Sequence, residues 1–337
     1  MFNRRQVLGG TAAVVALGSG PTAFSQPKKE ITISRQPGIL YMPLHVIEKH
    51  KLIEKHAEKL GLTGTTVKWV AFSNGGAQQE ALISGNVDLI NTGTGNLLLL
   101  WDRTKGGVKG IAATSAAPLT FISRDPRIAS LKDIGPGDKI AVTTVKVSTQ
   151  AILLQMAAAN MFGPDQWAKF DPHTVQMGHP DAFIAMKNHT HEVRSHFAAP
   201  PYDYYELREV PGARKLLDSA EIIGGPLTQG QFFTTTRFAE ANPKLIEAVR
   251  AAAEEAKSVI ATSMPEAIEA YREVNNDKTA ADVLADILRQ PGMQDWNLYP
   301  QGTMKFAAHL HKVGTLKTAP SSWKDYYLPV AHDLPGS

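Results

Sequence analysis

Residues 72–101 read FSNGGAQQEALISGNVDLINTGTGNLLLLW. Two clusters of small residues lie in this stretch, at 73–76 and 91–96, and each follows an apolar run with strand character and precedes a run with helical character. Strands that alternate with helices in this way predict βαβ units and a mostly parallel sheet. The stretch therefore places the chain in the α/β class.

The same alternation continues along the chain. Strands are predicted at 30–34, 67–72, 87–90, 110–113 with 118–122 beyond it, 139–142, 175–177, 194–197 and 231–236. Helices are predicted at 42–59, 77–84, 97–103, 151–160 and 180–187, and most of 242–313 is helical. Because the pattern restarts near residue 139, we expect one α/β unit to be interrupted by a second. The expected organisation is 26–124 as the first part of lobe I, 125–225 as lobe II, and 226–337 as the return to lobe I with C-terminal helices, with hinges near 114–124 and 226–236.

Composition excludes several kinds of site. The chain has 337 residues, of which 43% are hydrophobic, so it can bury a sizeable core and form two lobes. It has no cysteine, which excludes thiol nucleophiles, disulfides, thiolate metal sites and a lipid-anchoring cysteine. The net charge of +3 is small, and no block of Lys or Arg indicates a nucleic-acid surface. Nucleic acid is therefore not an expected partner.

The first residues predict an export signal at 1–25. MFNRR is a short basic segment, Val7 to Leu17 is an apolar segment too short to span a bilayer, and Ala23-Phe24-Ser25 has the small residues of a cleavage site. The segment from Asn3 to Leu8 resembles a twin-arginine signal, although a plain secretory signal is the alternative. No later segment approaches the roughly 18 apolar residues of a membrane helix. We expect an exported, soluble protein without a membrane anchor.

Three strand-to-helix turns have the chemistry of an anion site. They lie at 73–76, 92–96 and 147–150, and they are rich in Gly, Ser, Thr and Asn. In open α/β sheets ligands lie beyond the carboxyl ends of the strands, where helix N-termini expose unpaired N–H groups and a positive partial charge. Ordinary helix caps are the alternative for any one turn, but three equivalent turns in two α/β units favour a shared, neutral pocket.

A catalytic, metal or cofactor site is not predicted. The turn at 93–98 has Leu98 where a dinucleotide-binding loop needs its third glycine, no P-loop lysine follows either turn, and the motifs of serine hydrolases, zinc proteases and calcium loops are missing. Four residues could be read as metal ligands, but solvated or core side chains are the preferred interpretation: His189, His191, Glu192 and His196. Among three nearby tyrosines, Tyr202 is kept as a candidate because it follows Pro200-Pro201 at the end of a strand.

The chain also resembles a known family. The resemblance rests on Gln-Pro-Gly at 36–38, the pattern S-x-G-x-x-x-x-E-A-L-x-S-G-x-V-D at 73–88, and Ala-Asn-Pro-Lys-Leu-Ile-Glu-Ala at 241–248. With the export signal, these motifs resemble the solute-binding proteins of ABC importers, of the nitrate, sulfonate and taurine type, which share a fold with thiamine-pyrimidine-precursor binders. The resemblance implies a two-lobed periplasmic-binding-protein fold (type II), with two mostly parallel sheets flanked by helices and a two-strand hinge. It also implies a monomeric periplasmic protein with a small anionic ligand and an ABC permease in the inner membrane as partners.

In that family the ligand lies between the lobes, with its polar head at helix N-termini. Carried over to this sequence, the ligand-binding residues are Gln36, Pro37, Gly38, Ser73, Asn74, Gly75, Gly76, Thr92, Gly93, Thr94, Asn96, Ser148, Thr149, Tyr202, Thr228, Gln229 and Phe232. One departure concerns the ligand: the chain has Ala199-Pro200-Pro201-Tyr202 where the family often has Trp-Asp-Pro-Tyr. Taurine or an alkanesulfonate is therefore not assumed, and a carboxylate or an aromatic compound remains open.

The leading hypothesis is a binding protein that performs no chemistry. The first alternative is an enzyme of the same fold that acts on a pyrimidine or thiamine-related compound; such enzymes use a cysteine or a histidine-rich site, and this chain has no cysteine. The second alternative is a ligand-sensing protein that kept the fold. No cofactor is expected.

Overall fold

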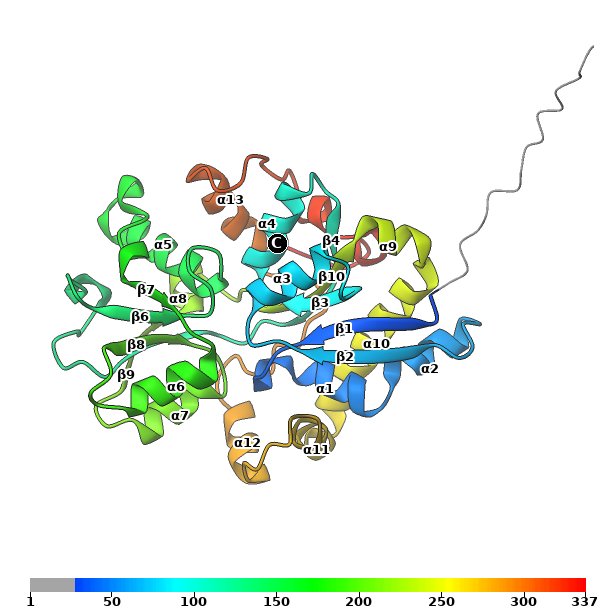
Figure 1. Cartoon of the computed structure of the whole chain (residues 1–337), viewed down its shortest axis with the longest axis horizontal. Coiled ribbons are helices and arrows are strands. Elements are labelled where there is room, and N and C mark those ends of the chain that lie inside the picture. Colours follow the sequence, from blue (N-terminus) through cyan, green and yellow to red (C-terminus); the bar gives the residue numbers. More distant parts are fainter. Residues whose placement is uncertain (1–27) are drawn as a thin grey trace, which may run out of the picture.

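The computed structural model describes residues 28–337, so the predicted signal segment lies outside the described residues. The chain forms two lobes, each built on a five-stranded sheet (Figure 1). In lobe I the strand order is β2 (Thr66–Ala71), β1 (Glu30–Arg35), β3 (Leu89–Thr92), β10 (Gly230–Thr235), β4 (Val108–Ser115). In lobe II it is β7 (Thr174–Gln176), β6 (Lys139–Val142), β8 (Val193–Ala198), β5 (Thr120–Ser123), β9 (Arg214–Asp218).

Each sheet is mostly parallel with one reversed strand. In lobe I, β10 is antiparallel to both of its neighbours, and in lobe II, β5 is antiparallel to both of its neighbours. These are the two strands that arrive from the opposite lobe. The parallel strands of each sheet end on the side that faces the other lobe. A strand that arrives from the other lobe begins on that side, and it therefore runs antiparallel to them. The prediction of two mostly parallel sheets is confirmed.

Helices cover both faces of each sheet (Figure 1). Those of lobe I are α1 (Met42–Lys49), α2 (Leu52–Lys59), α3 (Gly75–Ile83), α4 (Thr94–Arg103), α9 (Thr236–Ala241), α10 (Pro243–Thr262), α11 (Met264–Asn275), α12 (Ala281–Leu288) and α13 (Thr303–Lys312). Those of lobe II are α5 (Thr149–Phe162), α6 (His179–Lys187), α7 (Tyr202–Glu209) and α8 (Ser219–Ile223). Short 3-10 turns are η1 (Ile39–Tyr41), η2 (Leu131–Asp133), η3 (Pro164–Gln166), η4 (Asp171–His173), η5 (Trp323–Tyr326) and η6 (Pro329–Ala331).

The chain crosses between the two sheets at 116–119 and at 224–229. The crossings lie side by side, because the backbone N–H of Gln229 donates to the carbonyl oxygen of Ser115 at 2.8 Å. Strand β5 belongs to the second sheet although it precedes residue 125, where the sequence analysis placed the start of lobe II. The sequence pattern makes 118–122 look like a continuation of the preceding strand, because that apolar run does not reveal which sheet it joins.

Other sequence predictions also need correction. The helix predicted at 42–59 is two helices, α1 and α2, separated where Lys51 adopts a left-handed conformation with φ of 51°. The break lets α1 pack on α11 while α2 packs on α10. Helices α3 and α4 begin at Gly75 and Thr94, earlier than the predicted 77 and 97, so part of each turn is already helical. Helix α7 and strand β9 were missed; in α7 only Glu206 is fully buried, so there was no apolar stripe to detect.

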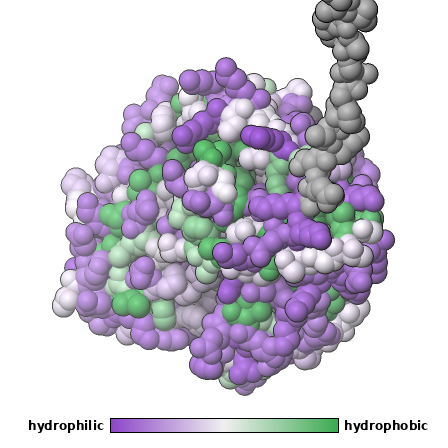
Figure 2. Space-filling view, turned by 45° about the vertical axis from the view of Figure 1, so that its right-hand side comes forward, coloured by the Kyte–Doolittle hydropathy of each residue, from purple (hydrophilic) through white to green (hydrophobic). Residues whose placement is uncertain are grey.

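The core is largely continuous across the lobes. One apolar cluster includes Ile33 and Leu97 of lobe I together with Ile140 and Ile152 of lobe II. Most of the face shown in Figure 2 is hydrophilic, and its apolar residues form small groups. Within residues 28–337, no helix combines the length and apolar character that a membrane crossing requires.

Candidate functional site

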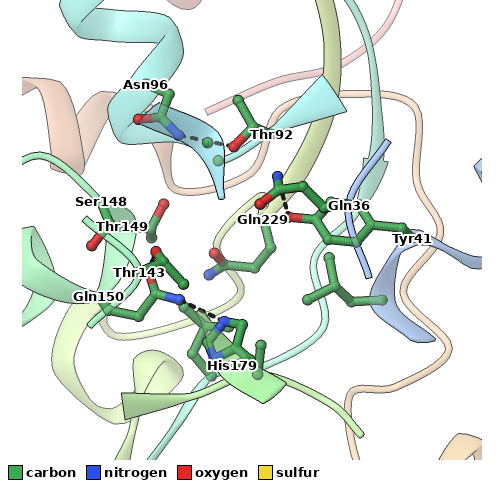
Figure 3. A pocket seen from close by; sticks show the side chains of 15 residues that line it. Gln36, Tyr41, Thr92, Asn96, Thr143, Ser148, Thr149, Gln150, His179 and Gln229 are labelled. Atoms are coloured by element: carbon green, nitrogen blue, oxygen red, sulfur yellow. Dashed lines mark hydrogen bonds between the residues drawn. The ribbon is translucent and has the colours of Figure 1, made fainter. Parts of the chain in front are cut away.

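A small cavity of about 30 Å³ lies where the two lobes meet (Figure 3). Its walls come from both sheets and from the crossing at 224–229. The lining residues are Gln36, Leu40, Tyr41, Gly75, Thr92, Gly93, Asn96, Leu119, Thr143, Ser148, Thr149, Gln150, His179, Ala199 and Gln229. All of these side chains are apolar or neutral-polar apart from His179, whose pKa is lowered well below its ordinary value by burial and by the neighbouring His196. The cavity is thus polar without a fixed charge.

Four helix N-termini meet at this cavity. Gly75 is the first residue of α3, Gly93 precedes α4, Ser148 precedes α5, and His179 is the first residue of α6. Each of these helices follows a strand whose carboxyl end points at the opposite lobe. The first turn of a helix carries N–H groups without intrahelical partners and a positive partial charge. The cavity therefore has a positive potential made from backbone dipoles, which suits an anion.

Two buried polar atoms of the lining have no hydrogen-bond partner within the described part of the chain. They are Nε2 of Gln229 and Oγ1 of Thr149, on residues that are each 4% exposed. Other lining side chains are paired: the Gln36 amide donates to the Tyr41 hydroxyl at 3.0 Å, and the Asn96 amide donates to Oγ1 of Thr92 at 2.8 Å. An unpaired buried donor costs about 1–3 kcal/mol, so these two groups are available to donate to an acceptor in the cavity.

The lobes touch directly beside the cavity. A Cβ atom added to Gly93 of lobe I would lie 2.3 Å from Oγ1 of Thr149 in lobe II, and one added to Gly95 would lie 2.8 Å from the carbonyl oxygen of Val147. Both distances are shorter than real Cβ contacts. The structure is therefore a closed arrangement, in which glycine allows the N-terminus of α4 to reach that of α5.

A chain of hydrogen bonds leads from the cavity into lobe II. The Gln150 amide nitrogen lies 3.2 Å from Nε2 of His179, Nδ1 of His179 lies 2.9 Å from Nε2 of His196, and Nδ1 of His196 lies 2.5 Å from Oε1 of Glu206. His196 and Glu206 are fully buried. Burial lowers the pKa of His196 to about 3 and raises the pKa of Glu206 well above its ordinary value. Burial alone thus favours the neutral form of both groups.

The residues considered as metal ligands are not brought together. His189 and Glu192 are exposed, whereas His196 is buried against Glu206. Within residues 28–337, no group of three or more His, Asp or Glu side chains is arranged to hold a metal ion.

The structure brings part of the predicted binding set together around the cavity. The predicted residues that line it are Gln36, Gly75, Thr92, Gly93, Asn96, Ser148, Thr149 and Gln229. The predicted residues that do not line it are Pro37, Gly38, Ser73, Asn74, Gly76, Thr94, Tyr202, Thr228 and Phe232. Ligand binding by the first group stays a prediction.

Several of the second group have structural roles instead. Oγ1 of Thr94 donates to the carbonyl oxygen of Thr228 at 2.7 Å, and Phe232 is fully buried in the middle of the lobe I sheet. The Asn74 side chain caps α3 by accepting from the N–H of Ala77 at 3.0 Å. Tyr202 stacks on the ring of His179, with centroids 5.9 Å apart, and so lies behind the cavity wall.

Sequence reasoning missed other lining residues, namely Leu40, Tyr41, Leu119, Thr143, Gln150, His179 and Ala199. A signal existed for two of them. Gln150 is the last residue of the third predicted turn, and His179 stands before Pro180, at the start of a helix that follows a strand. Both residues therefore lie in strand-to-helix turns, which is the same criterion that placed the other turns at the predicted binding site. Leu40 and Tyr41 belong to the 3-10 turn η1, which gave no pattern.

Comparison with known proteins identifies the fold. The sequence matches no family profile and no curated protein. The solved structures that it resembles include the alkanesulfonate-binding protein SsuA from Xanthomonas axonopodis pv. citri bound to MOPS, at 18% identity and a TM-score of 0.65 over 93% of this chain and 100% of that one. Another is the periplasmic nitrate-binding protein NrtA from Synechocystis, at 13% identity and a TM-score of 0.65 over 88% of this chain and 84% of that one.

A third similar structure, a Candida albicans gene product described as having the generic periplasmic binding protein fold, matches at 13% identity and a TM-score of 0.63 over 89% of this chain and 96% of that one. The expected two-lobed periplasmic-binding-protein fold is thus confirmed. The neighbours named for sulfonate and nitrate belong to the group that the sequence motifs resemble.

Proposed function

We propose that this protein is the substrate-binding component of an ABC importer and captures a compact anion between its two lobes. The observation that carries the proposal is the closed, uncharged cavity at four helix N-termini, with the free donors of Gln229 and Thr149 facing it. Neutral donors fixed in a dry site bind an anion strongly because water does not compete for it. The similar solved structures include proteins that bind an alkanesulfonate and nitrate.

The size of the cavity limits the ligand. A cavity of this kind needs about 10–15 Å³ to hold one water molecule, so a volume of about 30 Å³ favours a compact ligand in the closed site. A nitrate-sized anion, a small carboxylate or a short sulfonate suits it better than MOPS, the ligand of one similar structure. The apolar part of the lining is limited to Leu40, Leu119, Ala199 and the ring of Tyr41, which leaves little surface for a long tail.

The rest of the proposal concerns location and partners. The protein acts in the periplasm as a monomer and delivers its ligand to a permease of the inner membrane. The largely hydrophilic face in Figure 2 supports a protein that does not depend on a large apolar interface there. Opening at the two adjacent crossings, 116–119 and 224–229, releases the ligand.

The enzyme alternative has less support. A pyrimidine or thiamine-related compound is larger than the compact anions that a cavity of about 30 Å³ favours. The Ser, Thr and Tyr hydroxyls of the lining could act as nucleophiles only beside a base, and the one titratable base of the lining, His179, contacts Gln150 rather than a hydroxyl.

The test is a thermal-shift and calorimetry screen of the purified protein. The panel holds nitrate, bicarbonate, formate, acetate, methanesulfonate, taurine, sulfate, MOPS and a pyrimidine. A ligand at 100 times its dissociation constant adds about 2.7 kcal/mol to the free energy of unfolding, a shift of a few degrees. We expect hits among the compact monoanions. Binding of the pyrimidine alone, or its chemical conversion, would overturn the proposal.

A further inference from the structure

A chain of hydrogen bonds behind the cavity connects the site to a buried acid. It runs from the cavity wall through His179 and His196 to the carboxyl group of Glu206, and Figure 3 shows its first link, between Gln150 and His179. Each imidazole uses both ring nitrogens in this chain. A neutral imidazole has one N–H and one acceptor nitrogen, so the protons of both rings must point the same way along the chain. Only two orderly arrangements exist.

In the first arrangement Glu206 is ionised. Nδ1–H of His196 donates to the Glu206 carboxylate, Nδ1–H of His179 donates to Nε2 of His196, and the bare Nε2 of His179 accepts from the Gln150 amide. In the second arrangement Glu206 is protonated and donates to Nδ1 of His196, whose Nε2–H donates to Nδ1 of His179. Nε2 of His179 then carries a hydrogen that faces Gln150, so the Gln150 amide must turn until its oxygen, in place of its nitrogen, accepts this hydrogen.

The two arrangements differ by one proton. It bonds to Nε2 of His179 from solvent, the Nδ1 proton of His179 moves to Nε2 of His196, and the Nδ1 proton of His196 moves to Oε1 of Glu206. Both rings end neutral, and the carboxylate charge is removed. We propose that this relay makes the protein bind its anion together with one proton, which resides on Glu206. The inference rests on the proposed function and adds the charge state in which the ligand is held.

The surroundings of Glu206 favour the protonated arrangement. Its Oε2 has no hydrogen-bond partner in residues 28–337, and its one ion-pairing neighbour there is His196. A buried carboxylate without a cation costs several kcal/mol, which is the physical reason for its raised pKa. An anion in the cavity adds a second negative charge, and protonation of Glu206 relieves the repulsion between the two.

Burial is the cause of the raised pKa of Glu206, and Arg194, the one cation of strand β8, pairs with Asp125 at 3.2 Å. Acids and phenols lie near the relay as well: Tyr202 stacks on His179 and has Tyr205, Asp181 and Asp277 as neighbours, and Asp203 interacts with Glu206. Negative charge on any of these groups also stabilises the protonated form of Glu206 and so favours proton uptake. Lys187 of α6 pairs with Glu209 at 2.7 Å, and the Arg208 guanidinium lies 4.1 Å from the centroid of the Tyr204 ring, so both are held on the outer side of the helices.

Calorimetry of the purified protein with nitrate and methanesulfonate tests the relay. Both anions keep one charge between about pH 5 and pH 10, so an absorbed proton must be bound by the protein. Titrations in buffers of different ionisation enthalpy give the proton uptake. Above the pKa of the relay in the free protein, we expect uptake to approach about one proton per anion, and Kd to rise about tenfold per pH unit.

Glu206→Gln supplies the decisive variant, and Glu209→Gln is its matched control on the exposed side of the same helix. The amide introduced by Glu206→Gln can donate to Nδ1 of His196 at every pH, so we expect anion binding without proton uptake and without the pH dependence. The control should behave as the parent protein does. Nitrogen-15 NMR of the histidine rings gives an independent measurement, in which both rings of the complex should be neutral with hydrogen on Nε2.

The outcomes separate the two proposals. An anion that binds with constant affinity across this range and no proton uptake overturns the relay and leaves the binding function intact. An imidazolium at His179 in the complex overturns it as well. If no anion of the panel binds at any pH, the proposed function itself fails.

Discussion

Gly93→Ala should block closure of the lobes without disturbing either lobe. Gly93 has φ of −70° and ψ of 162°, a conformation that alanine adopts readily, so the backbone of lobe I is not strained. The new Cβ would lie 2.3 Å from Oγ1 of Thr149, whereas ordinary contact begins at 3.4 Å. The lobes must therefore stay apart by about 1 Å at this point, or the Thr149 hydroxyl must turn out of the cavity.

Either response weakens binding. Overpacking of this kind costs about 1–3 kcal/mol, which corresponds to a loss of about 5- to 150-fold in anion affinity. The melting temperature of the ligand-free protein should change little, because the contact joins the two lobes and belongs to the core of neither. Calorimetry gives the affinity, and small-angle scattering with and without the anion reports whether the protein still contracts.

Two comparisons make the test specific. Gly135→Ala, at a position with open space around it, is the matched control and should bind as the parent protein does. In a Thr149→Ala background the clashing oxygen is gone and the nearest remaining atom, the Cβ of residue 149, is 3.5 Å away, so Gly93→Ala should add little further loss. If Gly93→Ala binds with unchanged affinity and the protein still contracts, the closed contact between α4 and α5 is not part of the bound state.

Three further predictions concern single side chains. Gln229→Met should lower anion affinity by about 1–3 kcal/mol, which calorimetry measures. The melting temperature of the free protein should stay unchanged in a thermal melt, because Nε2 of Gln229 has no partner in residues 28–337 to lose. Thr94→Val should lower the free energy of unfolding by about 1–3 kcal/mol, measured by urea denaturation, because the buried carbonyl of Thr228 loses its donor. Burial raises the pKa of Asp203 to about 6, so the folded state holds its proton more tightly than the unfolded state. Stability should fall by at most about 3 kcal/mol as the pH rises from about 4 to about 6, and Asp203→Asn should remove that fall in denaturation curves across the range.

The sequence located the cavity better than it located the side chains that line it. Strand-to-helix turns mark where helix N-termini meet, and the turns at 73–76, 92–96 and 147–150 all contribute to the cavity wall. Turn chemistry does not reveal which way a neighbouring side chain points. Thr94 and Gly93 are adjacent, yet Thr94 bonds to Thr228 of the crossing at 224–229 while Gly93 faces lobe II.

The elements that were missed had a common physical cause. Helix α7 has the sequence YDYYELRE, in which polar and aromatic residues cover both faces, and its single fully buried side chain is Glu206. A buried acid is invisible to apolar periodicity because its place is decided by a partner, here His196 from another element, strand β8. Residues far apart in the sequence, such as Gln229 of the crossing and Thr149 on α5, likewise come to line one cavity only when the lobes meet.

Closure and the lack of a charged side chain belong together in the proposed site. Neutral N–H donors and helix dipoles bind an anion weakly in water, because water offers equivalent donors at high dielectric. When the N-terminus of α4 meets that of α5 through Gly93 and Thr149, water is displaced and the same dipoles act at a low dielectric constant. A lysine or arginine in the cavity would hold the anion in the open form as well and would slow its release. In a neutral cavity the affinity for the anion depends on closure of the lobes, so opening the lobes at the two crossings also releases the ligand.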